Sequence, residues 1–229
     1  TAEAGHYNIA IGDTAMGGSL VTGQNNIAIG HSAADALLAG ACNIALGENA
    51  LGAATIGLLN IAIGKEAMGA VTTGQADENI AIGGCALAGA AGTTGDKNIA
   101  IGINAAKGMT TGSQNIAIGA STSDAVTIGS CNIAMGINAF GTATEGNHNV
   151  AIGYSALGSG VTTGSDNVAI GRVTLSTLTT GICNVGIGRG ALSDLTTGCQ
   201  NIAMGNNAAD QLTTGKCNVA LGVDALGLS

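Results

Sequence analysis

One five-residue motif repeats along the whole chain and constrains the fold more than any other feature. Its pattern is Asn-[Ile/Val]-[Ala/Gly]-[Ile/Leu/Met]-Gly, and successive copies start 17, 18 or 19 residues apart. Such a repeat is too short for a helix pair, which needs about 33 residues, but it suits one coil of a β-solenoid. The motif occurs thirteen times, at Asn8, Asn26, Asn43, Asn60, Asn79, Asn98, Asn115, Asn132, Asn149, Asn167, Asn184, Asn201 and Asn218.

We therefore predict an all-β chain that forms a parallel β-solenoid, or β-roll, of about 13 coils with 17–19 residues per coil and almost no helix. No linker, charge run or compositional shift interrupts the repeats, so residues 1–229 are predicted to form a single β-solenoid repeat domain. The chain contains no Pro. This agrees with strands that pair on both sides, because Pro would remove a hydrogen bond from the ladder.

The alternation inside the motif predicts two faces. In residues 43–47, Ile44 and Leu46 point to one side, and Asn43, Ala45 and Gly47 to the other. We expect the Ile-type residues to fill the interior, together with the Leu or Met that follows an Ala seven residues after most motif asparagines. Gly would provide the tight corners, usually in a Thr-Thr-Gly turn.

The Ala and Gly face would then be flat and open to close packing against a second copy. Glu in place of Ala81, Ala100 and Ala117 is expected to separate the copies without unfolding the coil. The stacked asparagines are expected to be structural, each amide bonding the amides above and below it. A column of threonines lies five residues before most of them, where hydroxyl ladders suit turns and strand edges: Thr55, Thr93, Thr110, Thr127, Thr144, Thr162, Thr179, Thr196 and Thr213.

Charge and hydropathy exclude several classes of protein. The net charge is −8, which argues against a nucleic-acid partner and against binding to an anionic membrane surface. No apolar run reaches the roughly 18 residues that a membrane helix needs, so no membrane insertion is expected. Because the sequence starts at Thr1 and not at Met, it is expected to be a processed form or a segment of a longer protein.

The sequence carries no catalytic signature. His6, His31 and His148 fall in different columns of distant repeats, and no nucleophile elbow, phosphate loop or zinc-protease motif occurs. The chain has no Cys-x-x-Cys pair or His/Cys cluster of the kind that binds zinc. We expect neither enzymatic activity nor a metal or other cofactor.

The repeat Asn-Ile-Ala-Ile-Gly, followed by Ala-Leu and a Gly turn, resembles the head repeats of trimeric autotransporter adhesins. It is also similar to repeats in phage tail-fibre proteins. The resemblance covers Asn8 to Leu226 and implies an extracellular attachment fibre built from a left-handed β-roll that trimerises. This chain differs from the adhesin heads in its longer coil and in its cysteines, and it shows no stalk-like heptads and no anchor barrel.

Six cysteines stand outside the repeat pattern. Coils two apart are separated by about 9.6 Å, too far for a disulfide, so Cys183 and Cys217 are not expected to pair. Cys199 could pair with either of them. Two interpretations stay open for the cysteines: free thiols packed as small hydrophobic residues, or cross-links between chains in an oxidising extracellular setting. The candidate cross-linking residues are Cys42, Cys85, Cys131, Cys183, Cys199 and Cys217.

Three functions are considered. The first is a non-enzymatic structural protein that forms an extracellular homopolymeric fibre, filament or sheath. The alternative is a receptor-binding segment of a trimeric adhesin or phage tail fibre, with a surface glycan or receptor as partner. An ice-binding solenoid is third, because Ala39, Ile56, Ile128 and Glu145 break the threonine array. The expected location is extracellular, or a cell or virion surface.

Both ends of the sequence suggest how copies could join. Seven residues, Thr1 to Tyr7, precede the first motif, and twelve, Asn218 to Ser229, run from the last motif Asn onward. Together they match the longest coil, so the protein is its own expected partner, either as a homo-oligomer or as a head-to-tail polymer. Such a contact does not close on itself and generates a filament. Equally, the sequence could be a piece of a longer fibre whose ends carry no meaning.

Overall fold

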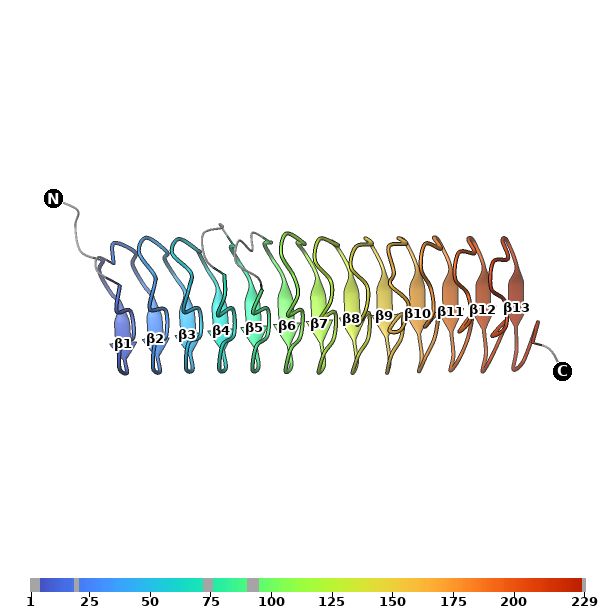
Figure 1. The fold of residues 1–229 in the computed structure, drawn as a ribbon, viewed down its shortest axis with the longest axis horizontal. Coiled ribbons are helices and arrows are strands. Elements are labelled where there is room, and N and C mark those ends of the chain that lie inside the picture. The colour runs from blue at the N-terminus through green and yellow to red at the C-terminus, as the bar shows by residue number, and fades with distance from the viewer. Residues whose placement is uncertain (1–4, 19–20, 72–75, 90–94, 228–229) are drawn as a thin grey trace. The chain divides into compact units, whose positions relative to one another are not determined.

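The computed structural model describes residues 5–18, 21–71, 76–89 and 95–227 and shows an all-β parallel solenoid. The chain divides into two compact units, Thr1–Gln114 and Asn115–Ser229, and each is described by itself. Thirteen three-residue strands form on the thirteen motifs, and no helix occurs among the described residues (Figure 1). The predicted fold class is confirmed, whereas the expectation of a single domain over 1–229 stays a prediction.

Every strand occupies the three residues that follow a motif asparagine. The first unit contains β1 Ile9–Ile11, β2 Ile27–Ile29, β3 Ile44–Leu46, β4 Ile61–Ile63, β5 Ile80–Ile82 and β6 Ile99–Ile101. The second unit contains β7 Ile116–Ile118, β8 Ile133–Met135, β9 Val150–Ile152, β10 Val168–Ile170, β11 Val185–Ile187, β12 Ile202–Met204 and β13 Val219–Leu221.

Within each unit, neighbouring strands are parallel and in register, so that equivalent residues stack on one another. Ile44 pairs with Ile27 on one side and with Ile61 on the other. The Ile44 N–H donates to Asn60 O at 2.8 Å, and the Gly47 N–H donates to Ile29 O at 2.8 Å. The ladder therefore continues beyond both ends of each short strand.

The structure reverses the expected orientation of the strand. The central Ala of the motif is buried in every strand except β1 and β11, whereas the first and third residues are half-buried or exposed. In β11 a buried Gly186 replaces the Ala, and a Cβ there would lie 2.7 Å from Cγ2 of Thr174. The smaller inner residue thus lies against the larger Thr174, as expected of a tightly packed interior.

Two corrections follow from the orientation. The Ile-type motif residues do not fill the coil, and Ala81, Ala100 and Ala117 do not form an outer surface, since each is at most 1% exposed. The coil is too narrow to hold two rows of Ile beside the opposite wall, so only Ala fits on the inward side of the strand.

Larger side chains enter the interior from the wall opposite the strand. The Leu or Met after the second Ala is buried, as predicted, in Leu51, Met68 and Leu87. In two coils a buried Ala follows this large residue three positions later. Leu51 is followed by Ala54, and Phe140 by Ala143, with all four side chains at most 2% exposed. In the coils of β10 and β11 both positions hold Leu instead, and Leu175, Leu178, Leu192 and Leu195 are all 0% exposed. The interior is therefore closely packed without a fixed alternation of large and small residues.

Corners are built in a way that the sequence reasoning did not anticipate. Besides the motif glycine, three equivalent positions in each coil have left-handed φ, and all but Gly190 hold non-glycine residues; in the coil of β3 they are Cys42 (59°), Asn49 (56°) and Leu51 (52°). Such a conformation costs about 1–2 kcal/mol per residue. Backbone hydrogen bonds to adjacent coils hold all three: Cys42 N–H to Gln24 O at 2.9 Å, Asn49 N–H to His31 O at 2.8 Å and Leu51 N–H to Ala67 O at 2.9 Å.

Glycine is required mainly where stacked backbones approach one another. The turn residue Gly40 has an ordinary φ, but a Cβ there would lie 2.5 Å from Gly57 O. The motif residue Gly47 adds a φ of 133°, and its Cβ would lie 2.7 Å from Gly64 O. The expectation that glycine supplies conformational freedom at every corner is therefore wrong for Gly40, where the reason is space.

Candidate interaction surface

The first and third residues of every strand form a surface that we call the outer apolar face. All 26 positions hold Ile, Val, Leu or Met, and none of these side chains is buried. Between β2 and β12, where a coil lies on either side, exposed fractions on this face reach 39% at Ile29 and 41% at Met204. At β13, Leu221 is 63% exposed.

This surface is continuous and uncharged within each unit. It runs over six strands in the first unit and seven in the second, with rows repeating at about 4.8 Å. Soluble monomers rarely expose a contiguous apolar patch beyond a few hundred Å², and larger patches mark interaction sites. A covering partner would remove these side chains from water without desolvating any charge.

The asparagines lie on the inner side of the coil, directly before each strand. Asn132 is 2% exposed. Its Nδ2 donates to Gly146 O at 2.9 Å and to Asn115 Oδ1 at 3.1 Å. Its Oδ1 accepts from the backbone N–H of Asn149 at 2.9 Å and from Asn149 Nδ2 at 3.2 Å. The amide thus uses all of its donors and acceptors and ties three coils together.

Threonine hydroxyls connect coils at the turn that precedes the motif. Thr179 Oγ1 donates to Thr196 O at 2.9 Å, and Thr196 Oγ1 donates to Thr213 O at 3.0 Å. Thr127 Oγ1 bonds Thr144 O at 3.0 Å in the same way. Thr93, a further member of the predicted column, lies outside the described residues, as do residues 1–4 and 228–229 of the predicted end contact.

None of the six cysteines forms a disulfide in the structure. Cys42, Cys183 and Cys217 are exposed and Cys131 is half-buried, all in the left-handed position just before the motif Asn. Cys199 is half-buried and forms no disulfide with Cys183 or Cys217, so neither intrachain pairing left open by the sequence occurs. Cross-linking between chains stays a prediction.

Cys85 differs from the other five thiols in its electrostatic surroundings. Burial raises the pKa of its thiol, and so do the hydrogen bond to Glu66 Oε2 at 3.5 Å and the charge of that carboxylate. Lys107 and Lys65 act in the opposite direction but more weakly. Cys85 therefore carries less thiolate at neutral pH than an unperturbed cysteine.

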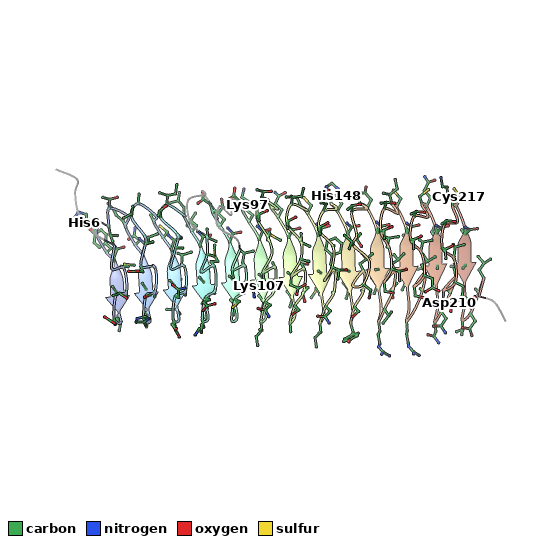
Figure 2. All side chains as sticks on the ribbon, in the orientation of Figure 1. His6, Lys97, Lys107, His148, Asp210 and Cys217 are labelled. Carbon is green, nitrogen blue, oxygen red and sulfur yellow. The ribbon has the colours of Figure 1, made fainter. Side chains whose placement is uncertain are left out.

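The histidines lie on the surface and far apart in sequence. His31 Nε2 is 3.8 Å from Asp13 Oδ2, and His148 Nδ1 is 3.6 Å from Asp166 Oδ1. Figure 2 shows His148 and Cys217 along one edge of the second unit, with Asp210 toward the opposite edge. Among the described residues, no three His, Cys, Asp or Glu side chains come together as metal ligands, and no pocket is found. That same part of the chain contains no helix long and apolar enough to cross a bilayer.

Comparisons with known proteins give no relative for this chain. No family model matches it, and neither a curated protein nor a solved structure gives a significant match.

Proposed function

We propose that this protein is a non-enzymatic structural protein whose copies assemble through the outer apolar face into an extracellular fibre, filament or sheath. The observation that carries the proposal is the composition of that face. Its 26 positions are outward, yet all of them hold apolar residues. Solvent-facing strand positions ordinarily alternate with polar residues, so an uninterrupted apolar face indicates a surface that is covered.

A second copy of this chain is the partner that fits best. Its outer apolar face has the same row spacing, the same width and the same absence of charge. Two such faces can interdigitate row by row, because both repeat at about 4.8 Å. A net charge of −8 makes two copies repel at long range, but none of that charge lies on the two columns that would meet.

The alternative is a receptor-binding segment of a trimeric adhesin or phage tail fibre at a cell or virion surface. It uses the same face for assembly and adds a ligand on another surface. The repeat resemblance supports it, and a charged row outside the apolar face gives it a candidate site, described below.

Light scattering coupled to size exclusion, followed by electron microscopy, tests the proposal. The expected result is an oligomer whose mass is a multiple of 21.8 kDa, or elongated particles. A monodisperse 21.8 kDa species at all concentrations up to the millimolar range would refute self-assembly. Defined oligomers that never elongate would favour the adhesin-segment alternative.

A further inference from the structure

One column of surface residues differs sharply between the two units. It consists of the residue directly after each motif glycine, which we call the post-glycine column. In the first unit Lys65 Nζ lies 3.3 Å from Glu48 Oε1, and His31 Nε2 lies 3.8 Å from Asp13 Oδ2. The full column is Asp13, His31, Glu48, Lys65, Gly84, Ile103, Ala120, Ile137, Tyr154, Arg172, Arg189, Asn206 and Val223.

In the second unit, Tyr154, Arg172 and Arg189 occupy this column in three successive coils. Their backbones are in register. The N–H of the residue after Arg172 donates to Tyr154 O at 2.9 Å, and the N–H of the residue after Arg189 donates to Arg172 O at 3.0 Å. All three side chains are exposed, and so is that of Asn206 in the next coil.

Arg172 and Arg189 have no counter-ion among the residues that the structure describes. Among the described residues, no carboxylate oxygen lies within 4.0 Å of either guanidinium. This is unexpected, because the second unit holds six acidic residues against three basic ones. Two like charges one coil apart, about 4.8 Å, repel each other, so the pair is electrostatically unfavourable until an anion joins it.

Tyr154 places an aromatic ring next to the two arginines. The Cζ atom of Arg172 lies 5.8 Å from the centroid of the Tyr154 ring, a cation–π geometry. Tyr154 remains 50% exposed, so ring surface is left for a ligand. The row therefore presents an aromatic surface, two guanidinium groups and, at Asn206, an amide, in that order along the solenoid.

We propose that the row from Tyr154 to Asn206 binds an anionic oligosaccharide. The ring can pack against the apolar face of a sugar, and guanidinium groups bind carboxylate or sulfate oxygens in a bidentate manner. The Asn206 amide can bond a hydroxyl group. Two cations match a ligand with one or two charges, whereas the acidic remainder of the unit repels a long polyanion such as nucleic acid.

Binding to immobilised protein tests this with three probes: sulfated lactose, sialyllactose and neutral lactose. Wild-type protein is expected to bind an anionic probe and not lactose, more weakly as salt rises. Sulfate is the recognised group if only sulfated lactose binds, carboxylate if only sialyllactose binds, and either group if both bind. The double variant Arg172→Gln/Arg189→Gln should weaken binding at least about tenfold.

Matched variants distinguish binding at the row from a general effect of positive charge. Lys65→Gln/Lys107→Gln removes two positive charges from the first unit and should change affinity less than about threefold, since those lysines lie outside the row. Tyr154→Ala should weaken binding severalfold. Absence of binding to both anionic probes, or an equal loss in the lysine variant, overturns the proposal.

Sedimentation of the same arginine variant distinguishes this proposal from self-assembly. Lost glycan binding with an unchanged molar mass supports the glycan site. A reduced molar mass with unchanged glycan binding would place the arginines in a contact between copies and refute it.

Discussion

The inner and outer sides of each strand consist of apolar residues, but their compositions differ. The inward position is Ala in twelve strands and Gly in one, whereas the outward positions vary among Ile, Val, Leu and Met. The inner column is constant in size because stacked backbones and the opposite wall leave room for one methyl group. The outer columns keep their apolar character but tolerate changes in shape. Constant size thus marks the packed interior, and constant polarity with variable shape marks a surface suited to contact with another chain.

The largest difference in stability between the inner and outer sides is expected when one Glu is introduced on each side in turn. Ala62→Glu places an unpaired carboxylate in the interior, where Ala62 is 0% exposed, and should lower the free energy of unfolding by about 5 kcal/mol. Ile63→Glu, one residue further on the outer side, should lower it by less than about 1 kcal/mol. Urea unfolding followed by circular dichroism measures both. Similar losses in the two variants would show that the sides are not distinct.

Removing an inner amide should have the next largest effect. Asn132→Ala leaves the N–H of Asn149 and the carbonyl of Gly146 without their buried partners and should cost about 4 kcal/mol. The control is Asn147→Ala, because Asn147 is exposed and its Oδ1 accepts one backbone bond from Ser130. That change should cost about 1 kcal/mol. Equal losses in the two unfolding curves would contradict a special role for the inner amides.

Ala substitutions should be destabilising at glycines where stacked backbones touch and harmless at glycines with open space around them. Gly47→Ala should cost about 3 kcal/mol, because φ is 133° and the new Cβ would meet Gly64 O at 2.7 Å. Gly84→Ala should be neutral or slightly stabilising, because the nearest atom to a Cβ there, Lys65 O, is 4.0 Å away and φ is not left-handed. Thermal melting of both variants checks the contrast, which fails if Gly84→Ala is the more harmful.

The smallest effect concerns thiol reactivity. Because the pKa of Cys85 is raised, less of it is thiolate at pH 8, and its alkylation should be severalfold slower than that of exposed Cys183. Peptide mass spectrometry after a short iodoacetamide pulse measures each rate. Raising the pH should reduce the difference between the alkylation rates of Cys85 and Cys183. Faster reaction at Cys85 would contradict the half-buried environment beside Glu66.

The motif spacing was sufficient to predict the fold class, because a 17-residue period admits a β coil and excludes a helix pair. Strand positions followed directly, since each begins one residue after a motif asparagine. The inward direction could not be obtained from alternation, which defines two faces but not which one is enclosed. Treating the larger apolar residues as the core placed Ile44 and Leu46 inside, although both are half-buried on the outer face.

The sequence did contain a signal for the correct orientation. In twelve of the thirteen motifs the central residue is Ala, and in the remaining one it is Gly186. Gly186 lies against Thr174, at a position where most coils have Ala. A small residue against a large one indicates contact inside a packed core, although Thr122 in the same column is followed by an unchanged Ala134 in the next strand. The sequence also places Tyr154, Arg172 and Arg189 at the same position of three successive repeats. That the two arginines lack a nearby carboxylate depends on side-chain positions, which the repeat pattern alone does not give.

Sedimentation velocity of an outer-face variant tests the central claim most directly. The variant Ile63→Glu/Ile152→Glu places one charge on the apolar face of each unit and leaves the interior unchanged. The account predicts wild-type β-rich circular dichroism together with a fall in mass to 21.8 kDa, from a larger species in the wild type. An unfolded variant, or an assembly of undiminished mass, would contradict it.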